Sequence, residues 1–355
     1  IKKSVFKAKD VARALLDLGV EIDGVDYDPL LMAYLLNPVR RGYEIDDLAL
    51  EYLGHSVKRG DPNQLVSEDS TDISLDAWLA ILLSGKLYSL VEGEDQLRVY
   101  GEIELPTVQT LARMEHNGVA IDVAKLEALF ERLSTEVSQV AKAAYDIIGH
   151  EINLASPKQL QVVLFDELKL PKTKKIKTGY TTDAESLDWL HQKSGHPVLT
   201  SLLRIRETKK LGTTVEGLIA EIAKDGRIHT HFQQTVAATG RLSSTGPNLQ
   251  NIPVRTEEGR RIREAFIPAE GCKLLSADYS QIELRIMAHI AEDENLLAAF
   301  RDGKDVHQAT AAEIFGIPLD DVNSEQRRYA KVINFGLIYG MSAFGLAGNL
   351  GIERS

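Results

Sequence analysis

The sequence predicts a multidomain protein of mixed class, α/β in some parts and all-α in others. Its 355 residues are enough for two or three domains. The spacing of apolar residues follows the helical period from about residue 102 to 225 and changes to the two-residue period of a strand after Gly226. A composition of 44% apolar and 26% charged residues is that of a globular chain, which excludes a disordered or collagen-like protein.

Charge and apolar runs restrict the function classes only in part. The net charge of −11 argues against nucleic-acid binding only weakly. Binding depends on where Lys and Arg lie and not on the sum of charges, so the net charge decides nothing. The longest apolar runs, Leu30–Leu36 and Ala77–Leu83, are shorter than the roughly 18 residues of a membrane helix, so no membrane helix is expected. The single cysteine, Cys272, permits no internal disulfide, and the chain starts without a signal segment. A cytoplasmic protein cut from a longer one is expected.

The middle region, from about residue 102 to 225, is predicted to be all helical, and its helix starts carry capping signals. Asp122 is a candidate N-cap for a helix of roughly 40 Å that ends at Gly149. Ser156-Pro157 begins a second helix. Thr182 and Glu185 form a capping box before a third.

Three further segments are polar or alternate in polarity, and none of them predicts a catalytic site. Ser56–Ser74 is predicted to be a surface loop. Lys169–Lys177 holds five lysines and no acid, so it is either a solvated loop or a contact to a phosphate backbone. Residues 228–236 alternate as in a strand, which places His229 and His231 on one face. Without a third ligand, the two histidines are interpreted as polar surface and not as a zinc site.

The stretch Lys273–Arg285 predicts a site at the end of a strand. An apolar run ends at Asp278, and Ile282, Ile286 and Ile290 then follow at helical spacing. A carboxylate in this place is a suitable ligand for Mg²⁺, which takes one or two carboxylates together with substrate phosphates. An ordinary helix cap is the alternative.

The stretch Asn323–Gly340 predicts a helix with a cationic and an aromatic end, started by a capping box of Asn323 and Gln326. Cations in its first two turns oppose the helix macrodipole at about 0.3 to 1 kcal/mol each. One stripe at a spacing of four residues consists of Arg327, Lys331, Phe335 and Tyr339. A nucleoside triphosphate has the same polarity, with phosphates at one end and a stackable base at the other. The alternative is an ordinary helix with buried rings and solvated arginines.

A third stretch, Thr239–Pro253, is rich in turns and in hydrogen-bond donors. Such segments can bind phosphates and the acceptors of the minor groove. By composition alone it is equally a surface loop.

Together and in this order, the three stretches resemble the family A DNA polymerases. Their motifs are Thr-Gly-Arg-Leu-Ser-Ser from residue 239, Asp-Tyr-Ser-Gln-Ile-Glu-Leu-Arg from residue 278, and Arg-x-x-x-Lys-x-x-x-Phe-Gly-x-x-Tyr-Gly from residue 327. The resemblance is close from about 226 to 350. It implies a vestigial 3′–5′ exonuclease-like (ribonuclease H-like) domain at 1–100, a helical thumb at 101–225, part of a palm sheet at 226–288 and part of the helical fingers at 289–355.

For the reaction, the resemblance implies template-directed transfer of a dNTP to a primer 3′-hydroxyl with two Mg²⁺ ions, for which Mn²⁺ can substitute. Asp278 and the carbonyl of Tyr279 would bind metal, and Glu283 would exclude a ribose 2′-hydroxyl. Lys331 would also protonate the departing pyrophosphate. The residues that would face the nucleotide are Arg327, Lys331 and His307 at the triphosphate, and Phe335 and Tyr339 at the sugar and base.

The implied partner is primer–template DNA, bound by a monomer. Contacts near the growing end would come from Arg241, Asn248 and Gln250. Arg206 and Lys210, one helical turn apart, would contact the duplex from the thumb.

Two departures from the family pattern carry expectations of their own. The second metal carboxylate of the family lies in a His-Asp-Glu motif that this sequence lacks, so the chain alone is expected not to polymerise although its parent can. In the exonuclease-like part, Lys7 occupies the position of a metal-binding Asp, and Trp78–Leu82 lies roughly where Tyr-x-x-x-Asp belongs. Tyr43 and Asp47 have that spacing but occur too early in the chain. No 3′–5′ exonuclease activity is therefore expected.

Two alternative functions remain open at this point. A non-catalytic DNA-binding relative would have no reason to keep Glu283, Lys331 and Tyr339 together. A single-subunit RNA polymerase is disfavoured because Glu283 would block the ribose hydroxyl.

Overall fold

The computed structural model describes residues 1–57, 59, 69–177, 179–254, 256–338, 340–342 and 345. They belong to two compact units, Ile1–Leu274 and Leu275–Ser355, each of which is described by itself. The predicted limits at residues 100, 225 and 288 stay predictions.

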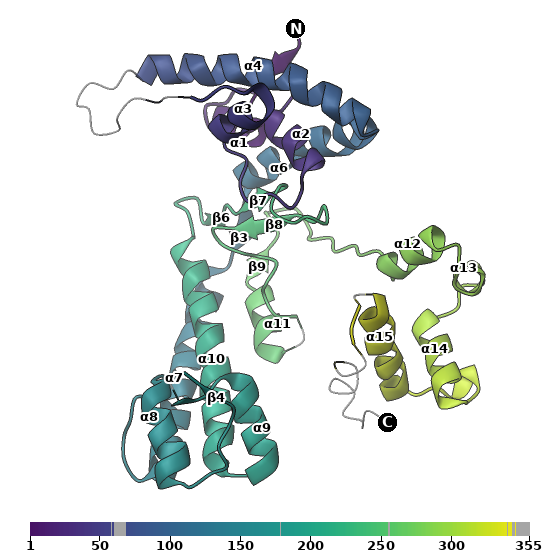
Figure 1. Cartoon of the computed structure of the whole chain (residues 1–355). Helices are drawn as coiled ribbons and strands as arrows, with labels where there is room; N and C mark the ends of the chain where they lie inside the picture. Colours follow the sequence, from purple (N-terminus) through teal and green to yellow (C-terminus); the bar gives the residue numbers. More distant parts are fainter. Residues whose placement is uncertain are drawn as a thin grey trace. The chain divides into compact units, whose positions relative to one another are not determined.

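The first unit begins with a small α/β part, which confirms the predicted mixed class (Figure 1). Strands β1 (Lys3–Ser4) and β2 (Val25–Tyr27) pair in parallel. The helices are α1 (Ala8–Asp17), α2 (Pro29–Leu36), α3 (Ile45–Leu53), α4 (Asp69–Gly93), α5 (Leu97–Val99) and α6 (Leu105–Asn117), with a π-helical turn at Tyr100–Glu104. Met32, Leu48 and Leu83 are fully buried in their common core.

Helix α4 corrects two sequence-based expectations. It begins at Asp69, so the loop predicted for Ser56–Ser74 ends earlier; residues 58 and 60–68 lie outside the described part. Its stretch Ile73–Gly93 is 21 residues long and is apolar enough for a membrane span by length and composition. Ser74, Asp76 and Ser84–Lys86 divide this stretch into apolar runs that are each too short to predict a membrane helix. Leu79, Leu83 and Leu87 of α4 pack in the core, whereas Ile73, Trp78 and Ile81 of the same stretch are exposed.

The next part is built on two long helices, α7 (Val123–Ile148) and α10 (Pro197–Ala220), which run side by side (Figure 1). The predicted start and end of α7 are confirmed, because Asp122 accepts a hydrogen bond from Lys125 N and Gly149 ends the helix in the left-handed region. Ser156 caps α8 (Pro157–Gln161) as predicted, and a π-helical stretch, Val162–Glu167, follows. The third cap is Asp183 and not Thr182: its side chain accepts from Ser186 N at 2.8 Å and starts α9 (Ala184–Ser194).

The prediction that this region is all helical is wrong, because the region also contains short strands. The lysine-rich segment forms β4 (Lys175–Ile176), which pairs with β5 (Gly179–Tyr180). Strand β3 (Val119–Ile121) is the centre of a three-stranded sheet with β6 (Arg227–Ile228) and β9 (Phe266–Ile267). Such short strands carry too few residues to show a two-residue period, and their pairing is set by partners distant in sequence.

The strand predicted for residues 228–236 is divided into β6 and β7 (His231–Gln233), which belong to different sheets. Strand β7 pairs with β8 (Ser243–Thr245), and α11 (Glu257–Arg263) follows.

The regular elements described in the second unit are all helical: α12 (Ile282–Ile290), α13 (Glu294–Arg301), α14 (Val306–Phe315), a 3₁₀ turn at Leu319–Asp321 and α15 (Ser324–Ile338). The strand predicted before Asp278 is wrong, because residues 272–279 are irregular and exposed. Leu274 and Leu275 are 62% and 92% exposed. An apolar run becomes a strand only where a neighbouring strand completes its hydrogen bonds, and no described strand pairs with this one.

Asp122→Ala is expected to lower the free energy of unfolding by about 1 kcal/mol, because the first turn of α7 loses the acceptor for Lys125 N. Urea denaturation measures the change. Asp146→Ala, which removes the same charge from an exposed place on α7, is the matched control and should stay within about 0.5 kcal/mol of the parent. Equal losses in the two variants would contradict the capping role.

Candidate functional site

The N-terminus of α15 has the predicted capping box. Asn323 Oδ1 accepts from Gln326 N at 2.9 Å, and Gln326 Oε1 accepts from Asn323 N at 2.9 Å. The box fixes the start of α15, so Arg327 and Lys331 lie in its first two turns. Both cations therefore lie near the positive end of the helix dipole, where a bound polyanion would relieve their repulsion.

Arg327 is held by the start of α14. Its guanidinium contacts Asp305 Oδ2 through Nε at 2.8 Å and through Nη2 at 2.7 Å. Asp305 is the N-cap of α14, and its other oxygen accepts from the backbone N of His307 and Gln308. Burial acts to raise the pKa of Asp305, but the hydrogen bonds from Arg327 and from the two backbone amides lower it overall. The ionised carboxylate thus ties α15 to α14.

His307 lies between the two helices and is 2% exposed. Asn334 of α15 donates from Nδ2 to His307 Nδ1 at 3.1 Å and to Thr310 Oγ1 at 3.0 Å. Burial lowers the pKa of His307, and the neighbouring Arg327 and Lys331 lower it further against the effect of Asp305. The ring is therefore neutral near pH 7 and, with Nδ1 accepting, carries its proton on Nε2.

The predicted stripe on α15 is present as far as the helix is described. Arg327, Lys331 and Phe335 lie on one face, with the Lys331 ammonium 5.9 Å from the centre of the Phe335 ring. The His307 ring lies 5.6 Å from the same ring. Tyr339 lies outside the described residues. The structure thus brings His307, Arg327, Lys331 and Phe335 together, with cations at one end and a ring at the other.

Asp278, Tyr279 and Glu283 lie at the other end of this unit's sequence. Asp278 and Tyr279 are exposed in the irregular segment, and Glu283 is in the first turn of α12. Within the described part, no hydrogen bond or ion pair joins Asp278 to Arg327 or Lys331. Asp278 is therefore not joined directly to the two cations of the stripe in the described structure.

The oxygens of Asp278 and Tyr279 suit a divalent ion such as Mg²⁺, which fills its other positions with water and substrate phosphates. No group of three potential ligand side chains that could hold a metal occurs among the residues described. A metal held here would thus depend on donors from outside these residues.

Two residues that complete the α14–α15 pair were not predicted, Asp305 and Asn334. Asp305 has the position of an N-cap, a local signal that the sequence does carry. Asn334 is an amide in the middle of a helix, where Asn is unfavourable unless its side chain has partners.

The predicted DNA contacts of the first unit gather around strand β8. Gln250 donates from Nε2 to the carbonyl of Leu242 at 3.0 Å, next to Arg241. Asn248 Oδ1 accepts from Gln250 N at 3.0 Å and from Asn251 N at 3.3 Å. These contacts bring Arg241, Asn248 and Gln250 to one loop cluster.

Arg206 and Lys210 lie on α10 at the predicted spacing of four residues. Lys210 is exposed, whereas Arg206 is half-buried near Asp183. Burial lowers the pKa of Arg206, and the Asp183 carboxylate partly offsets this. Of the pair, Lys210 is the more accessible to a polyanion.

In the exonuclease-like part, a lysine occupies the position where the family pattern has a metal-binding Asp. Lys7 Nζ forms an ion pair with Glu44 at 3.1 Å. Tyr43 is buried and donates its hydroxyl to the Asn37 carbonyl at 2.7 Å, while Asp47 is exposed, so the two do not act as a pair. Trp78 is 50% exposed on α4.

His229 and His231 are not arranged as metal ligands. His229 Nδ1 contacts the Glu115 carbonyl at 2.8 Å and its Nε2 contacts Asp225 at 3.0 Å. Gly118, with φ of 59°, has no room for a Cβ beside the His229 ring, 2.8 Å away. These contacts close the C-terminal end of α6.

Known proteins match almost the whole length of this chain. The family model for DNA polymerase family A matches residues 123–355, and that for the ribonuclease H-like domain of DNA polymerase I matches residues 1–61. DNA polymerase I of Mycobacterium tuberculosis H37Rv is 48% identical over 362 residues, which cover 99% of this chain and 40% of that protein. DNA polymerase I of Bacillus subtilis 168 is 42% identical, over 99% of this chain and 41% of that protein.

Among solved structures, the POL domain of Pol1 from M. smegmatis, in complex with DNA primer–template and dNTP, is similar with a TM-score of 0.89 and 47% identity. The match covers 99% of this chain and 61% of that chain. This chain spans about two fifths of the length of the curated relatives.

The match to the ribonuclease H-like domain at residues 1–61 and the likeness to the solved polymerase domain confirm the predicted fold class. The chain belongs to DNA polymerase family A, whose members use divalent metal ions.

Proposed function

We propose that the protein containing this chain is a DNA-dependent DNA polymerase that transfers deoxynucleotides to a primer 3′-hydroxyl in replication and repair. The observation that carries the proposal is the ordered face of α15, where Arg327 and Lys331 precede Phe335 in the order of phosphates and base. Family membership supports the same reading.

In this proposal, Arg327 and Lys331 bind the triphosphate, and the neutral His307 donates from Nε2. Phe335 and Tyr339 hold the sugar and base. The primer 3′-hydroxyl loses its proton to water, and its oxygen bonds to the α-phosphorus as the bond to the bridging oxygen breaks. Lys331 gives a proton to the departing pyrophosphate and regains one from water. Glu283 excludes a 2′-hydroxyl.

Asp278 and the carbonyl of Tyr279 would bind Mg²⁺, with Mn²⁺ as a substitute. Such an ion, when bound, supplies positive charge to the triphosphate and the leaving oxygen. Hard oxygen donors and an exposed position support this assignment.

We further propose that the protein has no 3′–5′ exonuclease activity, which the Lys7–Glu44 ion pair supports because a lysine cannot bind a divalent ion. It is proposed to act in the cytoplasm at the nucleoid, as a monomer without membrane attachment, because primer–template DNA is its substrate.

Arg241→Ala is expected to weaken binding of primer–template DNA about tenfold, the value of one charged hydrogen bond to phosphate or base. The anisotropy of a fluorescein-labelled duplex titrated with the 355-residue chain measures this. If Arg241 binds a backbone phosphate, the slope of log Kd against the logarithm of the salt concentration should decrease by about one in the variant.

Arg263→Ala removes an exposed arginine from α11 and serves as the matched control, with binding changed less than twofold. Absence of duplex binding by the parent chain, or equal losses in the two variants, would overturn the proposed DNA contact.

A further inference from the structure

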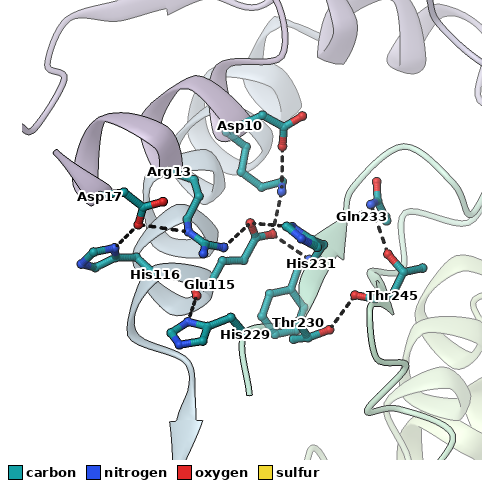
Figure 2. A network of polar contacts seen from close by, with 12 residues as sticks. Asp10, Arg13, Asp17, Glu115, His116, His229, Thr230, His231, Gln233 and Thr245 are labelled. Atoms are coloured by element: carbon teal, nitrogen blue, oxygen red, sulfur yellow. Dashed lines mark hydrogen bonds and ion pairs between the residues drawn. The ribbon is translucent and has the colours of Figure 1, made fainter. Parts of the chain in front are cut away.

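The first unit contains a buried carboxylate, Glu115 of α6, that joins its α/β part to the β7–β8 hairpin. The side chain is 1% exposed. Its Oε1 accepts from Lys9 Nζ of α1 at 2.6 Å and from the backbone N of Phe232 in β7 at 2.7 Å. Figure 2 shows Glu115 between Arg13 of α1 and His231 of β7. These two groups lie 3.9 and 3.6 Å from Oε2, an oxygen without a hydrogen-bond partner in the described structure.

A buried carboxylate is costly unless charged or polar partners compensate it, so its partners are held in place. Lys9 and the Phe232 amide share one oxygen of Glu115. The main chain of β7 is therefore fixed to α1 and α6 at the residue where the hairpin begins.

Three more hydrogen bonds to residues among the first 105 hold the segment that follows β7. Gln234 donates from Nε2 to the Glu104 carbonyl at 3.1 Å and to its carboxylate at 3.0 Å. Tyr34 of α2 donates its hydroxyl to the Ala237 carbonyl at 2.7 Å. The same carbonyl accepts from Gly240 N at 3.3 Å, so Tyr34 holds the turn that immediately precedes Arg241.

These contacts hold a segment that borders a cavity. The cavity has a volume of about 630 Å³, and its lining includes the Pro38–Glu44 loop together with Gln233, Thr235, Val236 and Ala238. Val236 is 66% exposed. Because this segment borders a cavity and Val236 is exposed, the polar contacts contribute to holding the direction of the turn.

We propose that Glu115 and Tyr34 are positioning residues for primer–template binding, which fix residues 232–237 and thereby direct Arg241 toward DNA. The inference rests on the proposed function. In this inference, the exonuclease-like part supports the DNA-binding loop of the polymerase. That role involves no metal.

The test uses Tyr34→Phe in the 355-residue chain, with Tyr43→Phe as its matched control. Both tyrosines are buried in the same core, and both donate to a carbonyl at 2.7 Å, but Tyr43 reaches Asn37 and not the turn. Tyr34→Phe is expected to weaken duplex binding about three- to tenfold, the value of one net hydrogen bond. Tyr43→Phe should change binding less than twofold, with a similar shift in melting temperature.

Glu115→Gln is the second variant, expected to weaken binding at least about tenfold and to speed hydrogen exchange of the Phe232 amide. Its control is His116→Gln, which breaks the His116–Asp17 contact of 2.8 Å between the same helices without touching β7. Where Glu115→Gln fails to fold, Tyr34→Phe decides alone.

A double-variant cycle with Arg241→Ala separates positioning from stability. In that background the effect of Tyr34→Phe should fall below twofold, because the residue it directs is gone. An undiminished effect, or equal effects of Tyr34→Phe and Tyr43→Phe, would overturn the inference. If Arg241→Ala itself leaves binding unchanged, the proposed DNA contact fails instead.

Discussion

Lys331→Ala is expected to weaken binding of a deoxynucleoside triphosphate about 10- to 100-fold, the loss that follows from removing a hydrogen bond between a cation and a phosphate. Lys331 is exposed on α15 and has no ion-pair partner in the described part of the chain. A bound triphosphate would supply the counter-charge that it lacks. Isothermal titration of dATP into the 355-residue chain measures the change, and the melting temperature should stay the same.

Arg328→Ala provides the matched control for this change. It removes the same charge three residues earlier on the same helix, from a side chain that lies 3.8 Å from Glu325 and over the Tyr329 ring. Arg328 lies outside the stripe, so its removal should cost only the long-range attraction between one positive charge and the triphosphate. Binding of dATP should therefore fall less than threefold. Equal losses in the two variants would show that the stripe does not bind the nucleotide.

The features that the sequence predicted correctly are those decided by neighbours in sequence. Asn323 with Gln326, and Asp122 before Lys125, form caps because a side chain meets an amide two or three residues away. The spacing of Arg327, Lys331 and Phe335 followed from the helical repeat. Where two caps compete within one turn, as Thr182 and Asp183 do, the pattern alone does not choose, and the stronger acceptor prevailed.

The features that could not be predicted depend on distant partners. Leu274–Leu275 has the composition of a strand, but a strand needs a neighbour to bond with, which a local pattern cannot supply. The role of Asn334 became visible only once α14 placed His307 and Thr310 beside it. The role of Glu115 likewise depends on distant residues, because its partners Lys9 and Phe232 come from α1 and β7.

Asp28→Asn is expected to remove a decrease in stability of about 4 kcal/mol that the parent shows between pH 4 and pH 8. Asp28 is 1% exposed and caps α2. Burial raises the pKa of its carboxyl to about 7 from 3.8, although the amides of Ala8 and Leu30 act against the rise. The folded state therefore takes up a proton that the unfolded chain has lost, so this stabilisation is complete below pH 3.8 and disappears as the pH rises through 7.

Urea denaturation of both proteins across this pH range measures the difference in unfolding free energy, which cancels the titration of every other group. Asp26→Asn changes the same charge two residues earlier and should follow the parent at each pH. The two amide donors, Ala8 N and Leu30 N, each contact a different oxygen of Asp28 at 2.9 Å, so the asparagine variant loses one acceptor at every pH. That loss shifts the plot of unfolding free energy against pH by the same amount at every pH. Proton uptake by the Asp28 carboxyl changes the slope of the plot instead. Parallel curves for the parent and Asp28→Asn would therefore mean that the carboxyl stays ionised in the fold, and that its two amide partners outweigh burial.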